Sequence, residues 1–99
     1  MVKHIILWNL KDYSEDEKSK IKAEIKESLE TLKGKIEGLI DIKVYTEGLS
    51  TSNVDLMLDS TFVDENALKF YATHPEHVAV ADTKVRPFTS SRNCMDFEI

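Results

Sequence analysis

Residues 2–10 read VKHIILWNL, and the pattern of this stretch sets the architecture expected for the whole chain. β-Branched, aliphatic and aromatic residues dominate it, as is typical of a β-strand. Because side chains alternate between the two faces of a strand, His4, Ile6 and Trp8 share one face. Both faces carry apolar side chains and need cover, yet a chain of 99 residues has little left for a second layer. The stretch therefore predicts a sheet with helices on one face and a second copy of the chain on the other.

A capping box follows at Ser14, because Glu17 stands three residues after it. Apolar residues then recur at spacings of three and four, which predicts a helix with one apolar face. They are Ile21, Ile25, Leu29, Leu32 and Ile36. Gly34 and Gly38 mark the end of this helix.

Two further strands are expected over residues 39–47 and 54–62, where apolar and polar residues alternate. The connection over residues 48–53 is small and polar, so the two strands are expected to form a hairpin. Asp55 and Asp59 share a strand face, and we interpret them as solvated charges in preference to a paired-carboxylate site.

The second half of the chain continues with short helices. Asp64 is expected to cap a helix whose buried side carries Ala67, Leu68 and Tyr71. Pro75 ends or restarts that helix, since proline is tolerated in a first helical turn but not in the interior. A second short helix or turn then covers about residues 75–82.

A last strand is expected over residues 93–99, after Pro87 and a polar lead at residues 89–91. The resulting order is β-α-β-β-α-β, which is the ferredoxin-like arrangement. We therefore expect one α+β domain over residues 1–99, with a four-stranded antiparallel sheet, helices on one face, and pairing into a dimeric α+β barrel.

Composition excludes several classes of protein. The formal net charge is −5, which argues against a nucleic-acid binder, since those usually carry a basic stripe. The charges alternate in sign, so an anionic membrane is also an unsuitable partner. The apolar run at residues 5–8 is too short for a transmembrane helix and is interpreted as a strand. Cys94 is the single cysteine, which allows no disulfide within the chain and favours a reducing, cytoplasmic location.

Residues 70–78, FYATHPEHV, hold two of the three histidines, His74 and His77. The third, His4, can point toward Tyr71 and His77 if the helices cover its strand face. Imidazole titrates near neutral pH and can take and return a proton, while a tyrosine hydroxyl can hold a carbonyl or enolate oxygen. We therefore name His77, Tyr71 and His4 as candidate catalytic residues.

A structural interpretation stands beside this one. His74 can cap the turn at Pro75, Tyr71 can be a core aromatic residue, and His4 can be a buried histidine with its hydrogen bonds satisfied. Cys94 is interpreted as a small core or surface residue in preference to a nucleophile. His74 and His77 supply two ligands where a metal usually needs three or four, so no metal site is expected from them. The three glycines are scattered and form no phosphate-binding loop, and no cofactor is expected.

The chain resembles the stress-responsive A/B barrel domain (Dabb) family over nearly its whole length. The similarity rests on residues 2–8, on residues 55–58 (DLML), and on HPEH at residues 74–77 after a helical tyrosine. Phe62, the pair Ala67-Leu68 and the closing pair Asp96-Phe97 extend it.

The resemblance implies a homodimer in which two ferredoxin-like sheets pack face to face. Most members have no assigned reaction. One plant member, olivetolic acid cyclase, closes a linear polyketide by an aldol condensation without a cofactor, using a histidine base and an assisting tyrosine. The matching positions are His77 and Tyr71, and His4 matches a strand histidine. Trp8 departs from the family pattern, because it replaces a smaller aliphatic residue on the cavity wall.

Three functions stay open at this point. The first is a barrel protein that binds a small apolar or aromatic molecule, with Ile6, Trp8 and His74 as ligand-binding residues. The second is a cofactor-free cyclase, isomerase or monooxygenase-like enzyme that uses His77 as base and Tyr71 as oxyanion partner, with His4 orienting one of them. The third is a purely structural dimer, which predicts a packed interior with no cavity.

Overall fold

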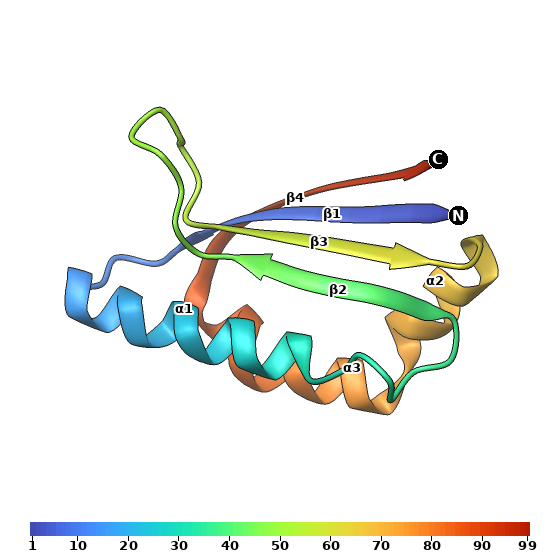
Figure 1. Ribbon diagram of the computed structural model, residues 1–99. Helices are drawn as coiled ribbons and strands as arrows, with labels where there is room; N and C mark the ends of the chain where they lie inside the picture. The colour runs from blue at the N-terminus through green and yellow to red at the C-terminus, as the bar shows by residue number, and fades with distance from the viewer.

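A computed structural model describes residues 1–99 and confirms the predicted order of elements (Figure 1). The strands are β1 (Val2–Leu10), β2 (Leu39–Tyr45), β3 (Leu56–Phe62) and β4 (Thr89–Glu98). The helices are α1 (Glu15–Glu30), α2 (Glu65–Thr73) and α3 (Pro75–Val80). A π-helical turn, η1 (Ala81–Val85), and a 3₁₀ turn, η2 (Arg86–Phe88), join α3 to β4.

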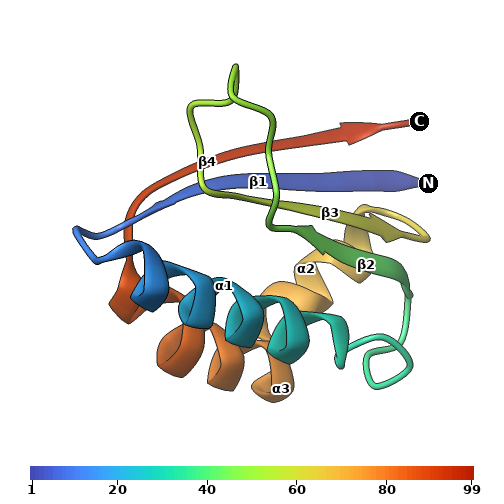
Figure 2. The same ribbon diagram turned by 60° about the vertical axis from the view of Figure 1, so that its left-hand side comes forward.

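The four strands form one antiparallel sheet in the order β2-β3-β1-β4. β1 lies between β3 and β4, with Ile6 opposite Leu58 on one side and Cys94 on the other. All the helices lie on one side of the sheet in both views (Figures 1 and 2). This is the ferredoxin-like α+β fold expected from the sequence.

The core lies between the sheet and the helices. Along β1 every even-numbered residue is buried and every odd-numbered one is half-buried, which is the alternation of a strand covered on one face. The buried even-numbered set is Val2, His4, Ile6, Trp8 and Leu10. Ile25 and Leu29 from α1 and Tyr71 from α2 pack against it from the helical layer.

The capping box at Ser14 is present, but α1 ends at Glu30, earlier than the apolar pattern indicated. Leu32 and Ile36 are still buried, although they come from the turns that follow the helix. The chain must reverse there to enter β2, and Gly34 and Gly38 adopt positive φ angles of 85° and 87° to do so. The apolar spacing therefore identified the core residues correctly and overestimated the length of the helix.

The last strand begins at Thr89, not at residue 93. Residues 89–91 were expected to be a polar lead, but they pair with the end of β1, where Leu10 lies opposite Thr89 and Asn9 opposite Ser91. Their backbone groups form hydrogen bonds with β1, so these residues are part of the strand although their polar side chains do not indicate one. The strands expected over residues 39–47 and 54–62 are each shorter by two residues.

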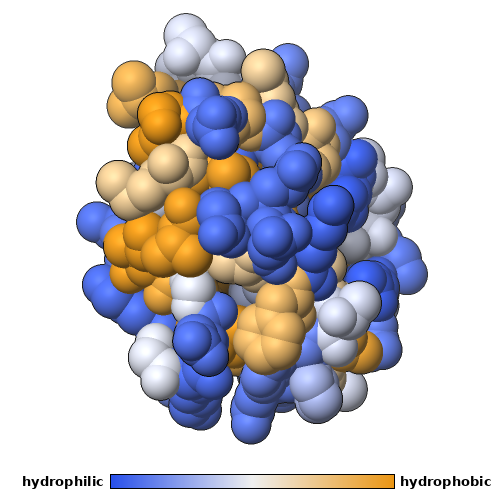
Figure 3. All heavy atoms as spheres, turned by 90° about the vertical axis from the view of Figure 1, so that its right-hand side faces the viewer, coloured by the Kyte–Doolittle hydropathy of each residue, from blue (hydrophilic) through white to orange (hydrophobic).

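The outer face of the sheet, opposite the helices, has no cover within the chain (Figures 1 and 2). Ile5, Leu7 and Met57 lie on it, and β4 adds Met95 and Phe97, whose exposed fractions are 66% and 39%. At the end of the molecule that carries both termini, a patch of hydrophobic side chains lies beside hydrophilic ones (Figure 3). None of the helices is long and apolar enough to cross a membrane.

Candidate functional site

Three elements bring the predicted catalytic residues together. His4 lies on the inner face of β1, and Tyr71 lies on α2, whose first turn is capped by Asp64 through a 2.8 Å hydrogen bond from the Ala67 amide. His77 lies on α3, which starts directly after α2 at Pro75. The capping residue and the proline thus place the two helical residues over the strand histidine.

Tyr71 is the centre of this group. Its ring centroid lies 4.1 Å from that of His77 and 6.2 Å from that of His4. The Phe62 ring packs against it at 5.0 Å. Tyr71 is only 1% exposed, and its hydroxyl oxygen is buried with no hydrogen-bond partner in the protein. Buried hydroxyls are normally paired, so an unpaired one is unusual.

A cavity of about 180 Å³ lies beside these rings, and we call it the sheet–helix cavity. Its wall is mostly hydrophobic and includes His4, Ile6, Trp8, Leu58, Tyr71, His77 and Val85. Ile6 and Trp8 thus lie where the sequence analysis expected ligand-binding residues. Trp8 is buried at 4% exposure and forms part of the wall without filling the space.

His74 does not line this cavity. It caps α3, where its Nδ1 accepts a hydrogen bond from the Glu76 amide at 3.1 Å, and its ring packs edge-on against Phe70. This is the structural alternative considered for His74 from the sequence. We therefore leave it out of the site proposed below.

Burial shifts the pKa values of Tyr71 and His77 in opposite directions. Burial raises the pKa of the Tyr71 hydroxyl well above its ordinary value of 10, so this group stays a protonated donor. Burial lowers the pKa of His77 below its ordinary 6.5, so its imidazole is neutral at neutral pH. With Nδ1–H donating to the Ala72 carbonyl at 3.3 Å, Nε2 is the nitrogen left free to accept a proton.

His4 is held from the opposite side. Its Nδ1 is hydrogen-bonded to Oδ1 of Asp96 on β4, the residue directly opposite in the strand register. Its own carbonyl accepts a 2.8 Å hydrogen bond from the buried Ser60 hydroxyl on β3. The strand histidine is therefore fixed in place by both neighbouring strands.

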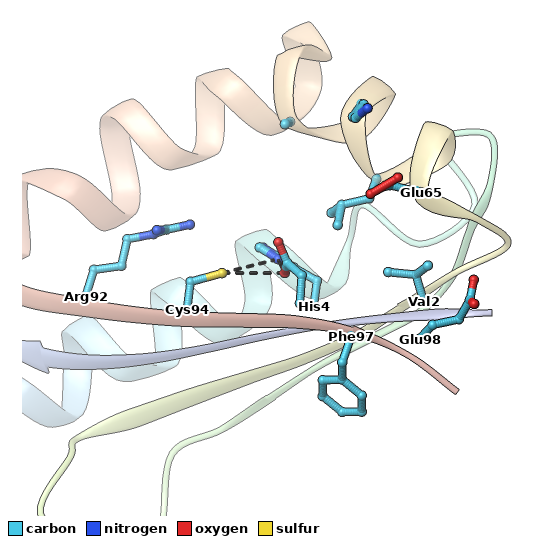
Figure 4. Close-up of a pocket in the computed structure, with 11 residues that line it drawn as sticks. Val2, His4, Glu65, Arg92, Cys94, Phe97 and Glu98 are labelled. Carbon is cyan, nitrogen blue, oxygen red and sulfur yellow. Dashed lines mark hydrogen bonds and ion pairs between the residues drawn. The ribbon is translucent and has the colours of Figure 1, made fainter.

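A second hollow, of about 770 Å³, lies between β4 and α2, and we call it the β4 cleft (Figure 4). Arg92 and Cys94 point into it from β4 beside His4, while Phe97 points to the other face of the sheet. Asp96 also lines this cleft. Partial burial and the neighbouring Asp96 carboxylate raise the pKa of the Cys94 thiol.

The sequence analysis did not identify these β4 residues as a group. Arg92, Cys94 and Asp96 alternate along the chain, so they share one face of β4. This pattern indicates a site only once the pairing of β4 with β1 is known, because that pairing places Asp96 opposite His4. Asp55 and Asp59, the acidic residues that share a strand face, have structural partners. Asp59 forms an ion pair with Lys3 at 2.9 Å, and Asp55 accepts a 2.8 Å hydrogen bond from the Leu10 amide.

The model of the stress-responsive A/B barrel domain family, Dabb, matches residues 2–99. The chain belongs to this family. This A/B barrel domain is similar to a dimeric protein of unknown function with a ferredoxin-like fold from Bacteroides fragilis. The two share 37% sequence identity at a TM-score of 0.90, covering 99% of this chain and 95% of the other.

Two more distant structures share the fold. A Dabb family protein from Mesorhizobium loti matches at 18% identity and a TM-score of 0.77, covering 99% of this chain and 95% of the other. The hydroxynitrile lyase of Passiflora edulis matches at 16% identity and a TM-score of 0.74, covering 99% and 92%. A comparison with curated proteins gives no match. The A/B barrel fold thus occurs both in an enzyme and in proteins of unknown function.

Proposed function

We propose that this A/B barrel domain binds a small aromatic molecule carrying a carbonyl or hydroxyl oxygen in the sheet–helix cavity. The observation that carries the proposal is the buried Tyr71 hydroxyl, which has no partner in the protein and belongs to a residue that lines a largely apolar cavity. An unpaired buried hydroxyl costs roughly 1–3 kcal/mol, and a ligand oxygen that accepts its hydrogen bond recovers that cost.

The size of the cavity indicates the size of the ligand. An apolar cavity of about 150 Å³ is large enough to bind benzene. The sheet–helix cavity, at about 180 Å³, therefore suits one ring with a short oxygen-bearing substituent. Its hydrophobic wall favours the ring, and Tyr71 supplies a donor for the substituent.

Acetophenone and ethylbenzene form a matched pair of probes, because they share a ring and a two-carbon substituent and differ in the carbonyl oxygen. Isothermal titration calorimetry on the wild type and on Tyr71→Phe gives four affinities. We expect acetophenone to bind Tyr71→Phe about tenfold more weakly than wild type, which corresponds to about 1.4 kcal/mol for the lost hydrogen bond. Ethylbenzene should bind both proteins equally. Equal affinity of the two proteins for acetophenone would refute the role of Tyr71.

A second candidate function is proton abstraction from carbon next to a carbonyl group. It is favoured by the contact between Tyr71 and His77, because a neutral imidazole lies beside a hydroxyl that stays protonated. In this reaction Nε2 of His77 takes the proton from the carbon, while the Tyr71 hydroxyl donates a hydrogen bond to the oxygen of the resulting enolate. Return of a proton to the same or another carbon completes an exchange or an isomerisation.

Hydrogen–deuterium exchange tests this step directly. In D₂O the wild type should accelerate the exchange of the methyl hydrogens of acetophenone, followed by proton NMR, and His77→Gln should not. The control His74→Gln removes a histidine that lies outside the cavity and should leave the rate unchanged. Exchange no faster with protein than with buffer would refute the catalytic role while leaving the binding proposal standing.

We also propose that the functional unit is a homodimer, built on the uncovered outer face of the sheet. Met95 and Phe97 expose apolar area there, and the Bacteroides fragilis protein is described as dimeric. The cytoplasmic location expected from the single cysteine stays a prediction.

A further inference from the structure

Three chemically different metal-ligating groups meet at the wall of the β4 cleft (Figure 4). They are the imidazole Nδ1 of His4, the thiol Sγ of Cys94 and the carboxylate Oδ1 of Asp96. Sγ lies 3.7 Å from Nδ1 and 3.5 Å from Oδ1, and Nδ1 and Oδ1 are hydrogen-bonded to each other. The three atoms come from two adjacent strands, since Asp96 is the register partner of His4 and Cys94 is that of Ile6.

We propose that His4, Cys94 and Asp96 bind a divalent transition metal ion of the Zn²⁺ type. Tetrahedral coordination at ordinary zinc distances places sulfur about 3.6 Å from a nitrogen or an oxygen ligand, and nitrogen about 3.4 Å from oxygen. The two sulfur distances already match these values. Only the hydrogen-bonded pair must separate, and the ion then replaces the proton between His4 and Asp96.

The ligand set selects the class of metal. Thiolate and imidazole prefer transition metals, whereas Mg²⁺ and Ca²⁺ are bound by oxygen atoms. The thiolate of Cys94 and the carboxylate of Asp96 together carry two negative charges, which balance a divalent cation. Binding releases the thiol proton to the solvent, and the proton between His4 and Asp96 moves from Nδ1 to Nε2 of the imidazole, which frees Nδ1 for the ion.

The group of His4, Cys94 and Asp96 is buried on one side and borders the β4 cleft on the other. His4 is only 8% exposed and belongs to a strand paired on both sides, so its position is rigid. Cys94 and Asp96 are exposed and border a cleft of about 770 Å³. Three protein ligands with a free side correspond to the open type of zinc site, in which water or a small molecule completes the coordination. Arg92 and Lys69 in the same cleft favour an anionic group at that fourth position.

This site does not depend on the proposed aromatic ligand. It includes His4, which also borders the sheet–helix cavity, but neither Tyr71 nor His77. The variant His77→Gln should therefore keep its metal affinity. That result separates failure of the metal site from failure of the cavity function.

Cobalt is the probe, since Co²⁺ reports its own coordination through its spectrum. Protein stripped with a chelator and titrated with Co²⁺ should bind one equivalent per chain. The expected spectrum has a thiolate-to-cobalt charge-transfer band in the near ultraviolet and intense visible bands of tetrahedral cobalt. Zn²⁺ should then displace the cobalt, as the order of affinities for such ligands requires.

Cys94→Ser and Asp96→Asn test the ligands, because both residues are exposed and each substitution nearly keeps the size of the side chain. Cys94→Ser should abolish the charge-transfer band, and each variant should weaken Zn²⁺ binding at least about 100-fold, since even outer-shell changes cost about 10–100-fold. Glu98→Gln is the matched control, because Glu98 borders the same cleft outside the ligand group. Absence of the band in wild type, or equal Zn²⁺ affinity in wild type and Cys94→Ser, would overturn the proposal.

Discussion

The ring of Tyr71 lies against that of His77, with centroids 4.1 Å apart, while its buried hydroxyl has no protein partner. This relationship joins two helices that the chain separates by a proline, α2 and α3. It keeps a protonated donor and a neutral base side by side in the wall of one small cavity. The predictions below follow from this pair and from the scaffold that holds it.

Replacing Tyr71 by Phe removes the unpaired hydroxyl and keeps the ring. A buried hydrogen-bonded tyrosine usually loses about 1 kcal/mol on this change, whereas an unpaired one relieves a cost. We expect the free energy of unfolding in urea to rise, or to stay within about 0.5 kcal/mol of wild type, with no ligand present. A loss above about 1 kcal/mol would show that the hydroxyl is already satisfied within the protein.

The stability of the protein should depend on pH through His77. Its pKa is lowered by burial in the folded state, so below pH 6.5 the unfolded chain binds more protons at this residue. The stabilising contribution is therefore present above 6.5 and is lost as the pH falls through the folded-state pKa. Urea unfolding between about pH 8 and about pH 5 should show a smaller loss of stability in His77→Gln than in wild type. A larger loss in the variant would contradict the assigned direction.

Dimer formation should depend on the outer face of the sheet. Met95→Glu places a charge among apolar side chains at a position that is 66% exposed in one chain, so the dimer should dissociate. Light scattering at micromolar concentration measures the change. Phe70→Glu is the control, since Phe70 is also exposed, at 50%, but lies on α2 at the helical side of the sheet. If both variants stay dimeric, the interface lies elsewhere.

Two glycines with the same backbone geometry separate conformational strain from steric clash. Gly34 and Gly38 have φ angles of 85° and 87°, but a Cβ at Gly34 meets nothing within 4 Å. At Gly38 it would lie 2.5 Å from the Cβ of Ala67 on α2. We expect Gly34→Ala to cost about 1–2 kcal/mol and Gly38→Ala about 3 kcal/mol or more in urea unfolding. Equal costs would mean that α2 moves aside freely.

The fold was predictable because its signals are local. Strand alternation in residues 2–10, the capping box at Ser14 and the break at Pro75 are each read from a few neighbouring residues, and all three are confirmed. The end of α1 and the start of β4 were wrong because both depend on distant partners. Leu32 is drawn into the core after the helix ends, and Thr89 becomes a strand residue by pairing with Leu10.

The site was predictable only in part for the same reason. His4, Tyr71 and His77 could be grouped because two of them lie six residues apart and the third lies on the face that the helices cover. The contribution of β4 was missed, since the contact of Asp96 with His4 spans 92 positions in the chain and depends on strand register. The cavity itself has no signal in the sequence, because its volume depends on how Trp8 packs.

The central claim is that an aromatic molecule occupies the sheet–helix cavity against Tyr71. Intermolecular nuclear Overhauser effects in a solution of the protein with acetophenone test it most directly. We predict effects from the ligand ring to the side chains of Tyr71, Trp8 and Leu58, which all line the cavity. Effects confined to Met95 and Leu7, on the outer face of the sheet, would contradict the claim and would make the dimer surface the binding site.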